Sequence, residues 1–458
     1  MPLETPKRLP LVAVPSNRGT DTNKDAKLVN CYAQKDESDT YQIYNRPGIL
    51  IFQTQVGAGE GVYQWRNNTY SIFGTTFFKD GAAIPGLIDS TNGKYVFSQC
   101  QGATPKLVFG NGIKAYTYDA GAGLVQITNV NFPVAFVKGW AYLDATLYVM
   151  DASGNIFGSG LNDPQTWTAL NKIVANVDAG AGVALAKQLA YVVAFKEWST
   201  EVFFDANNPT GSPLSAAQNA FIVWGCASAD SVQDADGILY WLAINQHSKL
   251  EIMAMENMAT KPIASKAVER LLNGVDFSKI YSWYMSAMGY RFYGITFVNS
   301  NLTLVYDITE GLWHQWTDSA GNYWPMIAYV STNGLKQIFQ HAINGKLYYC
   351  DYSYTNDDGA VFFKDIVTPN FDGDSRKGKY VKWFEILADQ EPGSIVYVRN
   401  SDDDYITWSD FRAVDLGNKR PRFENGGTFY KRAYHIRHQG DQKLRIKAIE
   451  LSMDECIL

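Results

Sequence analysis

Hydrophobic residues along most of this 458-residue chain fall in short runs rich in aromatic and β-branched side chains. From about residue 50 to residue 365, runs of roughly 4 to 8 such residues alternate with Gly, Asn or Asp turns. Clear examples lie at residues 61–74, 140–157 and 341–352, where Asn-Asn, Ser-Gly-Asn and Asn-Gly separate two runs. The pattern predicts antiparallel hairpins and an all-β protein.

Tryptophans recur near the hairpins at a spacing that suggests a repeat. Trp140, Trp198, Trp241 and Trp283 are separated by 58, 43 and 42 residues, close to the roughly 40 to 50 residues of a four-stranded propeller blade. Residues 51–365 would supply six or seven such blades, and we expect a β-propeller of six. A pair of β-sandwich domains would use the same strand chemistry and is the alternative.

Two segments interrupt the strand pattern, at residues 212–221 and 265–274. In the second, Ser265 is a suitable N-cap, Val268, Leu271 and Leu272 form one apolar face, and Gly274 is a typical helix end. We predict a short surface helix there.

Flanking segments differ from this body in composition. Residues 1–50 contain five prolines, which predict an extended N-terminal arm lying over its own or a neighbouring subunit. Residues 376–458 carry 15 basic and 13 acidic side chains, whereas residues 1–375 carry only 25 and 33. We therefore assign residues 1–50 to the arm, 51–365 to the propeller and 366–458 to a β-sandwich-like C-terminal domain, with the boundary between Val367 and Lys379.

Charge and apolar residues alternate near the C-terminus. Leu444, Ile446 and Ala448 would face inward, and the basic residues between them outward. A solvated sandwich face is one interpretation, and a docking surface guided by charge is the other. On the second, the subunit or adaptor interface includes a basic set and an acidic set that would meet on neighbouring subunits: Arg432, Lys443, Arg445 and Lys447, and Asp402, Asp403 and Asp404.

Several classes of protein are disfavoured by the remaining composition. A net charge of −6 argues against a surface that grips nucleic acid. No apolar run of 18 residues exists and no apolar stretch follows the charged start, so we expect no membrane span, no secretory signal and synthesis in the cytosol. The five cysteines lie 69 to 126 residues apart, so we expect reduced, mostly buried thiols.

Catalytic and metal-binding signatures are also missing from the sequence. It has no HExxH, nucleophile elbow, Walker loop or dinucleotide fingerprint. His435 and His438 would lie on opposite faces of a strand, and we interpret them as surface residues. Asp230, Asp234 and Asp236 only loosely resemble a sialidase Asp-box, and residues 370–378 lack the acids of a calcium loop, so we interpret the first as a turn and the second as a linker. We expect no enzyme activity, cofactor or metal.

The stretch from Gly225 to Gly274 contains a Gly-Cys turn, an Asp-Ser loop, the strand LYWL and Pro-Ile-x-Ser before the short helix, in that order. In this it resembles the tail hub proteins of short-tailed bacteriophages, also called nozzle or packaged-DNA stabilisation proteins. Residues 29–34, 45–50, 159–170 and 195–213 are similar to other family segments. The likeness covers most of residues 25–455.

This resemblance implies a structural virion protein of the tail, assembled in the host cytoplasm. It implies a homo-oligomeric ring, for which we favour a hexamer, lying below the adaptor, carrying tailspikes or fibres and closing on a tail needle. Double-stranded DNA would pass through the channel without specific binding, in keeping with the net charge of −8 of residues 1–375. The alternatives are a propeller glycoside hydrolase and a carbohydrate-binding receptor protein, both acting on bacterial surface polysaccharide.

Overall fold

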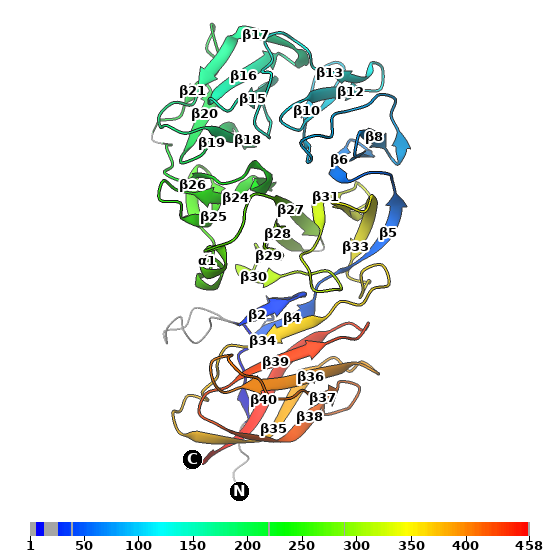
Figure 1. Cartoon of the computed structure of the whole chain (residues 1–458), viewed down its shortest axis with the longest axis vertical. Helices are drawn as coiled ribbons and strands as arrows, with labels where there is room; N and C mark the ends of the chain where they lie inside the picture. The colour runs from blue at the N-terminus through cyan, green and yellow to red at the C-terminus, as the bar shows by residue number, and fades with distance from the viewer. Residues whose placement is uncertain (1–5, 13–25, 38–39, 219, 288, 457–458) are drawn as a thin grey trace.

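A ring of β-sheets and a smaller β domain beneath it make up the chain (Figure 1). The computed structural model describes residues 6–12, 26–37, 40–218, 220–287 and 289–456. Strands account for nearly all of the regular structure in these ranges, which confirms the all-β prediction and the propeller.

Seven groups of antiparallel strands form the blades of the ring in the described ranges; six are separate sheets, and blade six is part of a larger sheet. Blades one to three are β6 (Gly59–Trp65), β7 (Asn68–Phe73), β8 (Thr76–Lys79) and β9 (Ala82–Ala83); β10 (Val96–Cys100), β11 (Lys106–Gly110), β12 (Ala115–Asp119) and β13 (Gly123–Gln126); and β14 (Ala141–Leu143), β15 (Thr146–Met150), β16 (Asn155–Gly160) and β17 (Asp163–Val174). Blades four and five are β18 (Gly182–Gln188), β19 (Tyr191–Lys196), β20 (Thr200–Asp205) and β21 (Leu214–Ala216); and β22 (Gly225–Cys226), β23 (Gln233–Ala235), β24 (Ile238–Ile244), β25 (Leu250–Glu256) and β26 (Ala259–Pro262). Blades six and seven are β27 (Ile280–Ala287), β28 (Tyr290–Phe297), β29 (Leu302–Asp307) and β30 (Leu312–Gln315); and β31 (Met326–Ser331), β32 (Gln337–His341), β33 (Lys346–Asp351) and β5 (Gly48–Thr54).

The blade count therefore exceeds the six that we expected. The blades begin at residues 59, 96, 141, 182, 225, 280 and 326, so they are shorter on average than the tryptophan spacing suggested. Tryptophans do not recur in every blade, and the fourth strand of blade seven comes from the N-terminal end of the chain. For both reasons, counting blades from the tryptophan repeat gives one blade too few.

β5 closes the ring by pairing with β33, which lies almost 300 residues later in the sequence. Gln340 then links blade seven to blade one, because its Oε1 accepts a hydrogen bond from Gly61 N at 2.7 Å and its Nε2 donates to Ile72 O at 2.8 Å. A propeller closed in this way depends on a strand that precedes the first blade.

Tight turns join the strands of each blade, as the sequence predicts. Gly154 and Gly345 adopt φ of 80° and 72° in the Ser-Gly-Asn and Asn-Gly turns, a conformation that glycine enters without strain. The predicted helix is α1 (Lys266–Leu272), capped by Ser265, whose hydroxyl accepts from Val268 N at 3.3 Å. Residues 212–221 instead contain β21.

Aromatic side chains fill the interfaces between blades. Between blades six and seven, Trp283, Trp316, Trp324 and Phe339 are all buried, with neighbouring ring centroids 4.8 to 5.4 Å apart. Each such ring removes a large apolar area from water, so aromatic packing is the main force that holds blades six and seven together.

The second domain is a sandwich of two sheets over one apolar core. One sheet contains β1 (Lys7–Arg8), β3 (Cys31–Lys35), β4 (Tyr41–Asn45), β40 (Arg445–Cys456), β35 (Gly378–Ala388) and β38 (Arg422–Phe429). The other contains β2 (Lys27–Val29), β34 (Lys364–Val367), β39 (Ala433–His438), β36 (Ile395–Ser401) and β37 (Arg412–Asp415). The described part of the N-terminal arm thus supplies strands to this domain and is not a separate segment.

β2 joins the two domains through the backbone. It pairs in parallel with β30 of blade six at Val29 and Gln315, and in antiparallel fashion with β34, so one nine-stranded sheet runs from the propeller into the sandwich. The chain leaves the propeller after β33 and enters the sandwich at β34. The transition therefore lies at residues 352–363, ahead of the predicted boundary, and residues 370–377 form a loop inside the sandwich.

Candidate functional site: the joint and the charged C-terminal surface

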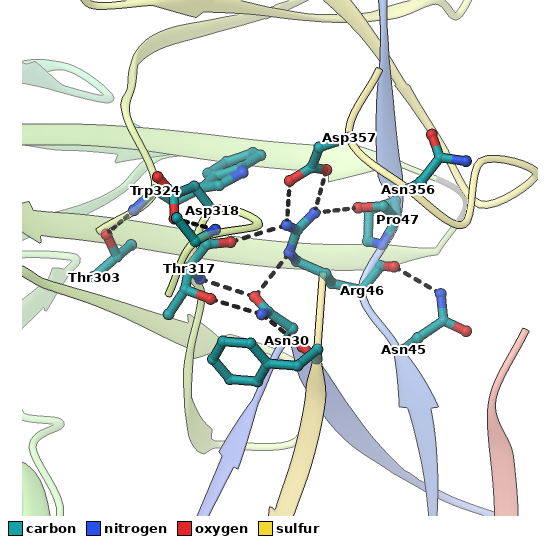
Figure 2. A network of polar contacts seen from close by, with 12 residues as sticks. Asn30, Asn45, Arg46, Pro47, Thr303, Thr317, Asp318, Trp324, Asn356 and Asp357 are labelled. Atoms are coloured by element: carbon teal, nitrogen blue, oxygen red, sulfur yellow. Dashed lines mark hydrogen bonds and ion pairs between the residues drawn. The ribbon is translucent and has the colours of Figure 1, made fainter. Parts of the chain in front are cut away.

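Arg46 lies at the point where the two domains meet, between β4 and β5 (Figure 2). Its side chain is completely buried. The guanidinium forms a two-pronged ion pair with Asp357, with N to O distances of 2.9 and 2.6 Å, and also donates to Pro47 O, Thr317 O and Asn30 Oδ1 at 2.9 to 3.0 Å. All five N–H donors of the guanidinium are therefore satisfied.

Asn30 extends this network to the linker that enters the sandwich. Its Nδ2 donates to Thr317 Oγ1 at 2.7 Å and to Phe363 O at 2.8 Å, and its Oδ1 accepts from Thr317 N. The ring of Phe362 lies 3.7 Å from the guanidinium carbon of Arg46, a cation–π contact. These contacts hold together four segments that are distant in the sequence. The network therefore forms a rigid joint between the two domains.

Arg432 and Asp402 were predicted to meet across a subunit boundary, but they pair within one chain. Arg432 Nε and Nη2 lie 2.6 and 2.7 Å from the Asp402 oxygens, and the arginine side chain is only 3% exposed. Lys431 similarly pairs with Asp404 at 2.6 Å. The turn that carries these acids folds back on the end of β39, so their charges are largely satisfied inside the domain.

Asp403 accepts hydrogen bonds from residues of its own loop. Its carboxylate accepts from Ser401 Oγ and from the backbone and hydroxyl of Thr407, and the bonds from Thr407 lower the pKa of Asp403 to about 2. The acidic tip that the sequence predicted is therefore a structured turn.

The basic strand near the C-terminus has the predicted alternation. Leu444, Ile446 and Ala448 are buried. Arg445 Nε and Nη2 donate to Gln42 Oε1 at 3.0 and 2.9 Å, and Lys447 Nζ lies 2.7 Å from Asp389. Lys443 is exposed and has no ion pair with the residues that the structure describes. Its role in an interface stays a prediction.

The histidine interpretation was wrong, since His435 and His438 are 5% and 0% exposed. His438 lies on the face of β39 that carries the core residues Tyr434 and Ile436, and the rings of Trp408 and Phe411 cover His435 on the other face. Burial lowers the pKa of His438 to about 3. The cysteine prediction is confirmed for four residues, which are free and buried: Cys31, Cys100, Cys226 and Cys350.

A central cavity of about 550 Å³, which sequence reasoning missed, is lined by the innermost strands of all seven blades. In it Lys138 Nζ lies 2.9 and 3.0 Å from the two oxygens of Asp230, and Lys94 Nζ donates to Ser282 O at 3.2 Å. Burial lowers the pKa of Lys94 to about 8, helped by Lys138 and opposed by Asp230. Isolated charges carry no sequence signal that would group them.

Within the described ranges, no cluster of His, Cys, Asp and Glu has the arrangement of a metal site. Asp234 accepts from Gly237 N at 2.7 Å, as expected for a turn. No helix among the described residues is long and apolar enough to cross a membrane.

Comparison with protein families gives one match over most of the chain. The model of the family described as "Bacteriophage P22 Gp10, beta-propeller" matches residues 12–354. No curated protein matches.

Among solved structures, partial similarity is found to several proteins of low sequence identity. Virginiamycin B lyase from Staphylococcus aureus is 8% identical (TM-score 0.43) over 67% of this chain and 98% of its own. The N-terminal domain of Nup159 is 9% identical (TM-score 0.40) over 71% and 98%, and the computationally designed Ika8 protein is 11% identical (TM-score 0.39) over 66% and 99%. Neither activity nor binding can be transferred at this similarity.

Proposed function

Because the chain belongs to the bacteriophage P22 Gp10 β-propeller family, and is therefore a phage structural protein, we propose that it is the tail hub, or nozzle, of a short-tailed phage. In this role copies of the chain form a ring, favoured as a hexamer, below the adaptor, and the ring continues the DNA channel and helps to retain packaged DNA. The family match over residues 12–354 is the observation that carries the proposal.

The joint supports a mechanical role. The continuous sheet through β2 and the buried Arg46 network connect propeller and sandwich without a flexible linker at this point. A load applied to one domain is then transmitted to the other through backbone hydrogen bonds. Such a rigid subunit suits a ring that must resist the pressure of packaged DNA.

Charge supports passage of DNA without tight binding. Residues 1–375, which include the whole propeller, carry a net charge of −8. A surface of this sign repels phosphates and gives no counterion release, the main source of affinity for DNA. In the ring, contacts between copies would be heterologous and closed, with tailspikes or fibres outside and a needle below.

The test is assembly on phage heads. The purified chain is added to heads that carry the adaptor but lack the hub, and the particles are imaged by negative stain. We expect a ring of density below the adaptor and less DNA released on dilution. Heads that stay bare and leak DNA at the same rate would contradict the proposal, and release of reducing ends from host lipopolysaccharide would favour the hydrolase alternative.

A further inference from the structure

A groove of about 800 Å³ separates the propeller from the outer face of the sandwich. α1 and β30 form its propeller wall, and β2, β34, β36 and β39 form much of the opposite wall. The joint at Arg46 connects the two domains that supply these walls.

A row of polar side chains, called the ladder here, crosses the sandwich wall and consists of Asp365, Arg437, His435 and Arg399. Arg437 makes a two-pronged ion pair with Asp365 at 2.6 and 2.7 Å. His435 Nε2 lies 3.2 Å from Asp365 Oδ1, and Arg399 Nε donates to His435 Nδ1 at 3.0 Å. Strand register explains the order, because Asp365 faces Arg437 and Arg399 faces His435. With a neutral histidine the ladder has a net charge of +1.

Arg399 is the incompletely satisfied end of this ladder. Its guanidinium carbon lies 5.1 Å from the ring centroid of Trp408 and 4.5 Å from that of Phe411, which fix its plane. No described residue accepts a hydrogen bond from its two Nη nitrogens. His435 is 5% exposed and its Nε2 has no partner of hydrogen-bond geometry. Arg399 is half-buried in the wall of the groove, so its Nη edge can donate to an acceptor that enters the groove.

The propeller wall is apolar and partly uncovered. Leu271, expected from the sequence on the buried face of the helix, is 42% exposed and lines the groove together with Leu312 and Trp313. An occupant that pairs a negative charge with a large apolar side chain therefore fits both walls.

We propose that this groove is a docking site for a short segment of another virion protein that carries a carboxylate side chain next to a large apolar one. The carboxylate accepts from the free Nη edge of Arg399, and the apolar side chain packs against Leu271 and Trp313. The identity of the partner as a virion protein rests on the proposed function, whereas the carboxylate site rests on the groove alone.

The charge of the groove favours an anionic occupant. Its lining carries four positive charges, on Lys27, Arg270, Arg399 and Arg437, and one negative charge, on Asp365. The planar edge of a guanidinium also matches the two oxygens of a carboxylate.

The probe for the test is 4-fluorophenylacetate, and its binding to the intact chain is measured by fluorine NMR line broadening. The uncharged analogue 4-fluorophenylacetamide is the control probe. We expect millimolar binding of the acid and at least fivefold weaker binding of the amide. Arg399→Gln should weaken binding of the acid at least fivefold, and Leu271→Ser should weaken both probes. Lys172→Gln, an exposed residue of β17 in blade three that does not line the groove, is the matched control and should change neither.

Equal binding of acid and amide, or no binding of the acid at 20 mM, would overturn the proposal. So would displacement of the acid by inorganic phosphate at a lower concentration than by acetate, which would indicate a phosphate site. Because Leu271 is exposed, its variant keeps the test valid if Arg399→Gln does not fold. None of these outcomes depends on whether the ring forms on phage heads.

Discussion

Contacts between blades and the joint between domains are held by different forces. Between blades six and seven, four aromatic rings pack against one another, and shape and apolar area determine the fit. At the joint, one arginine is bound by five acceptor contacts from four segments of the chain. An apolar interface tolerates substitutions of similar volume, whereas a buried polar joint fails when one partner is lost.

The largest effect is expected from cutting the chain at the domain limits that the sequence suggested. A fragment of residues 51–365 lacks the first three residues of β5, all of β2 and Arg46, so ring closure loses half of its paired residues and the joint cannot form. We expect it to show no cooperative thermal transition by circular dichroism. A sharp transition with native near-UV signal would show that the blades close by aromatic packing alone.

A chain that starts at residue 26 is the control for this truncation. Among described strands it loses only β1, whose two residues are exposed. It should still melt cooperatively, at a lower temperature because Leu9 and Leu11 leave the sandwich core.

The next effect concerns the joint itself. Arg46→Met leaves the carboxylate of Asp357 buried without its partner, and we expect a loss of about 3–5 kcal/mol in the free energy of unfolding. Urea denaturation measures this loss. The double variant Arg46→Met/Asp357→Leu also removes the unpaired carboxylate and should recover part of the lost free energy of unfolding. If the double variant is as unstable as the sum of both single variants, the pair is not coupled as described.

Phe339→Leu makes the corresponding change in an aromatic interface. It removes part of one ring among four and keeps the site apolar, so the expected cost is only about 1–2 kcal/mol. A cost equal to that of Arg46→Met would remove the distinction between the two kinds of contact.

The sequence predicted local features well and long-range ones poorly, for physical reasons. The Asn-Gly turn at Gly345 and the Ser265 cap of α1 are set by a few neighbouring residues. The pairing of β5 with β33 joins residues about 300 positions apart, and Arg46 in the sequence is one arginine before a proline. Nothing in the spacing of the chain indicates that Asp357 lies beside it.

The same limit applies to the candidate interface. Alternation along one strand predicted the buried side of residues 443–448, but the partner of Arg432 depends on how the loop of Asp402 folds back. A charge pattern shows which residues face outward and does not show which neighbour in the same chain reaches them.

A smaller effect on stability is expected from Glu60, at a contact between blades. Burial raises its pKa to about 8, and Asp89 raises it further while Lys138 opposes the change. Because the folded pKa lies above the unfolded value of about 4.5, the folded state loses stability as pH rises from about 4.5 to 8. Glu60→Gln should match the wild type near pH 4.5 and exceed it at pH 9 by about 1 kcal/mol or more. Parallel pH profiles of the two proteins in urea denaturation would contradict this.

The smallest effect on stability is expected at the charged C-terminal strand, where Lys443, Arg445 and Lys447 are reversed together to glutamate. Their side chains lie at the surface, and Lys447 loses only its half-exposed pair with Asp389, so the cost in free energy of unfolding should stay near 1 kcal/mol. If this strand guides docking, as we propose, the reversal places repulsive charges at every copy of the interface, and the effects add up around a ring. The triple variant should melt near the wild-type temperature yet fail to attach to adaptor-capped heads, measured by cosedimentation at physiological salt. Normal attachment would show that docking uses another face. A large drop in melting temperature would mean that the contacts with Gln42 and Asp389 contribute more to stability than the exposure of these side chains suggests.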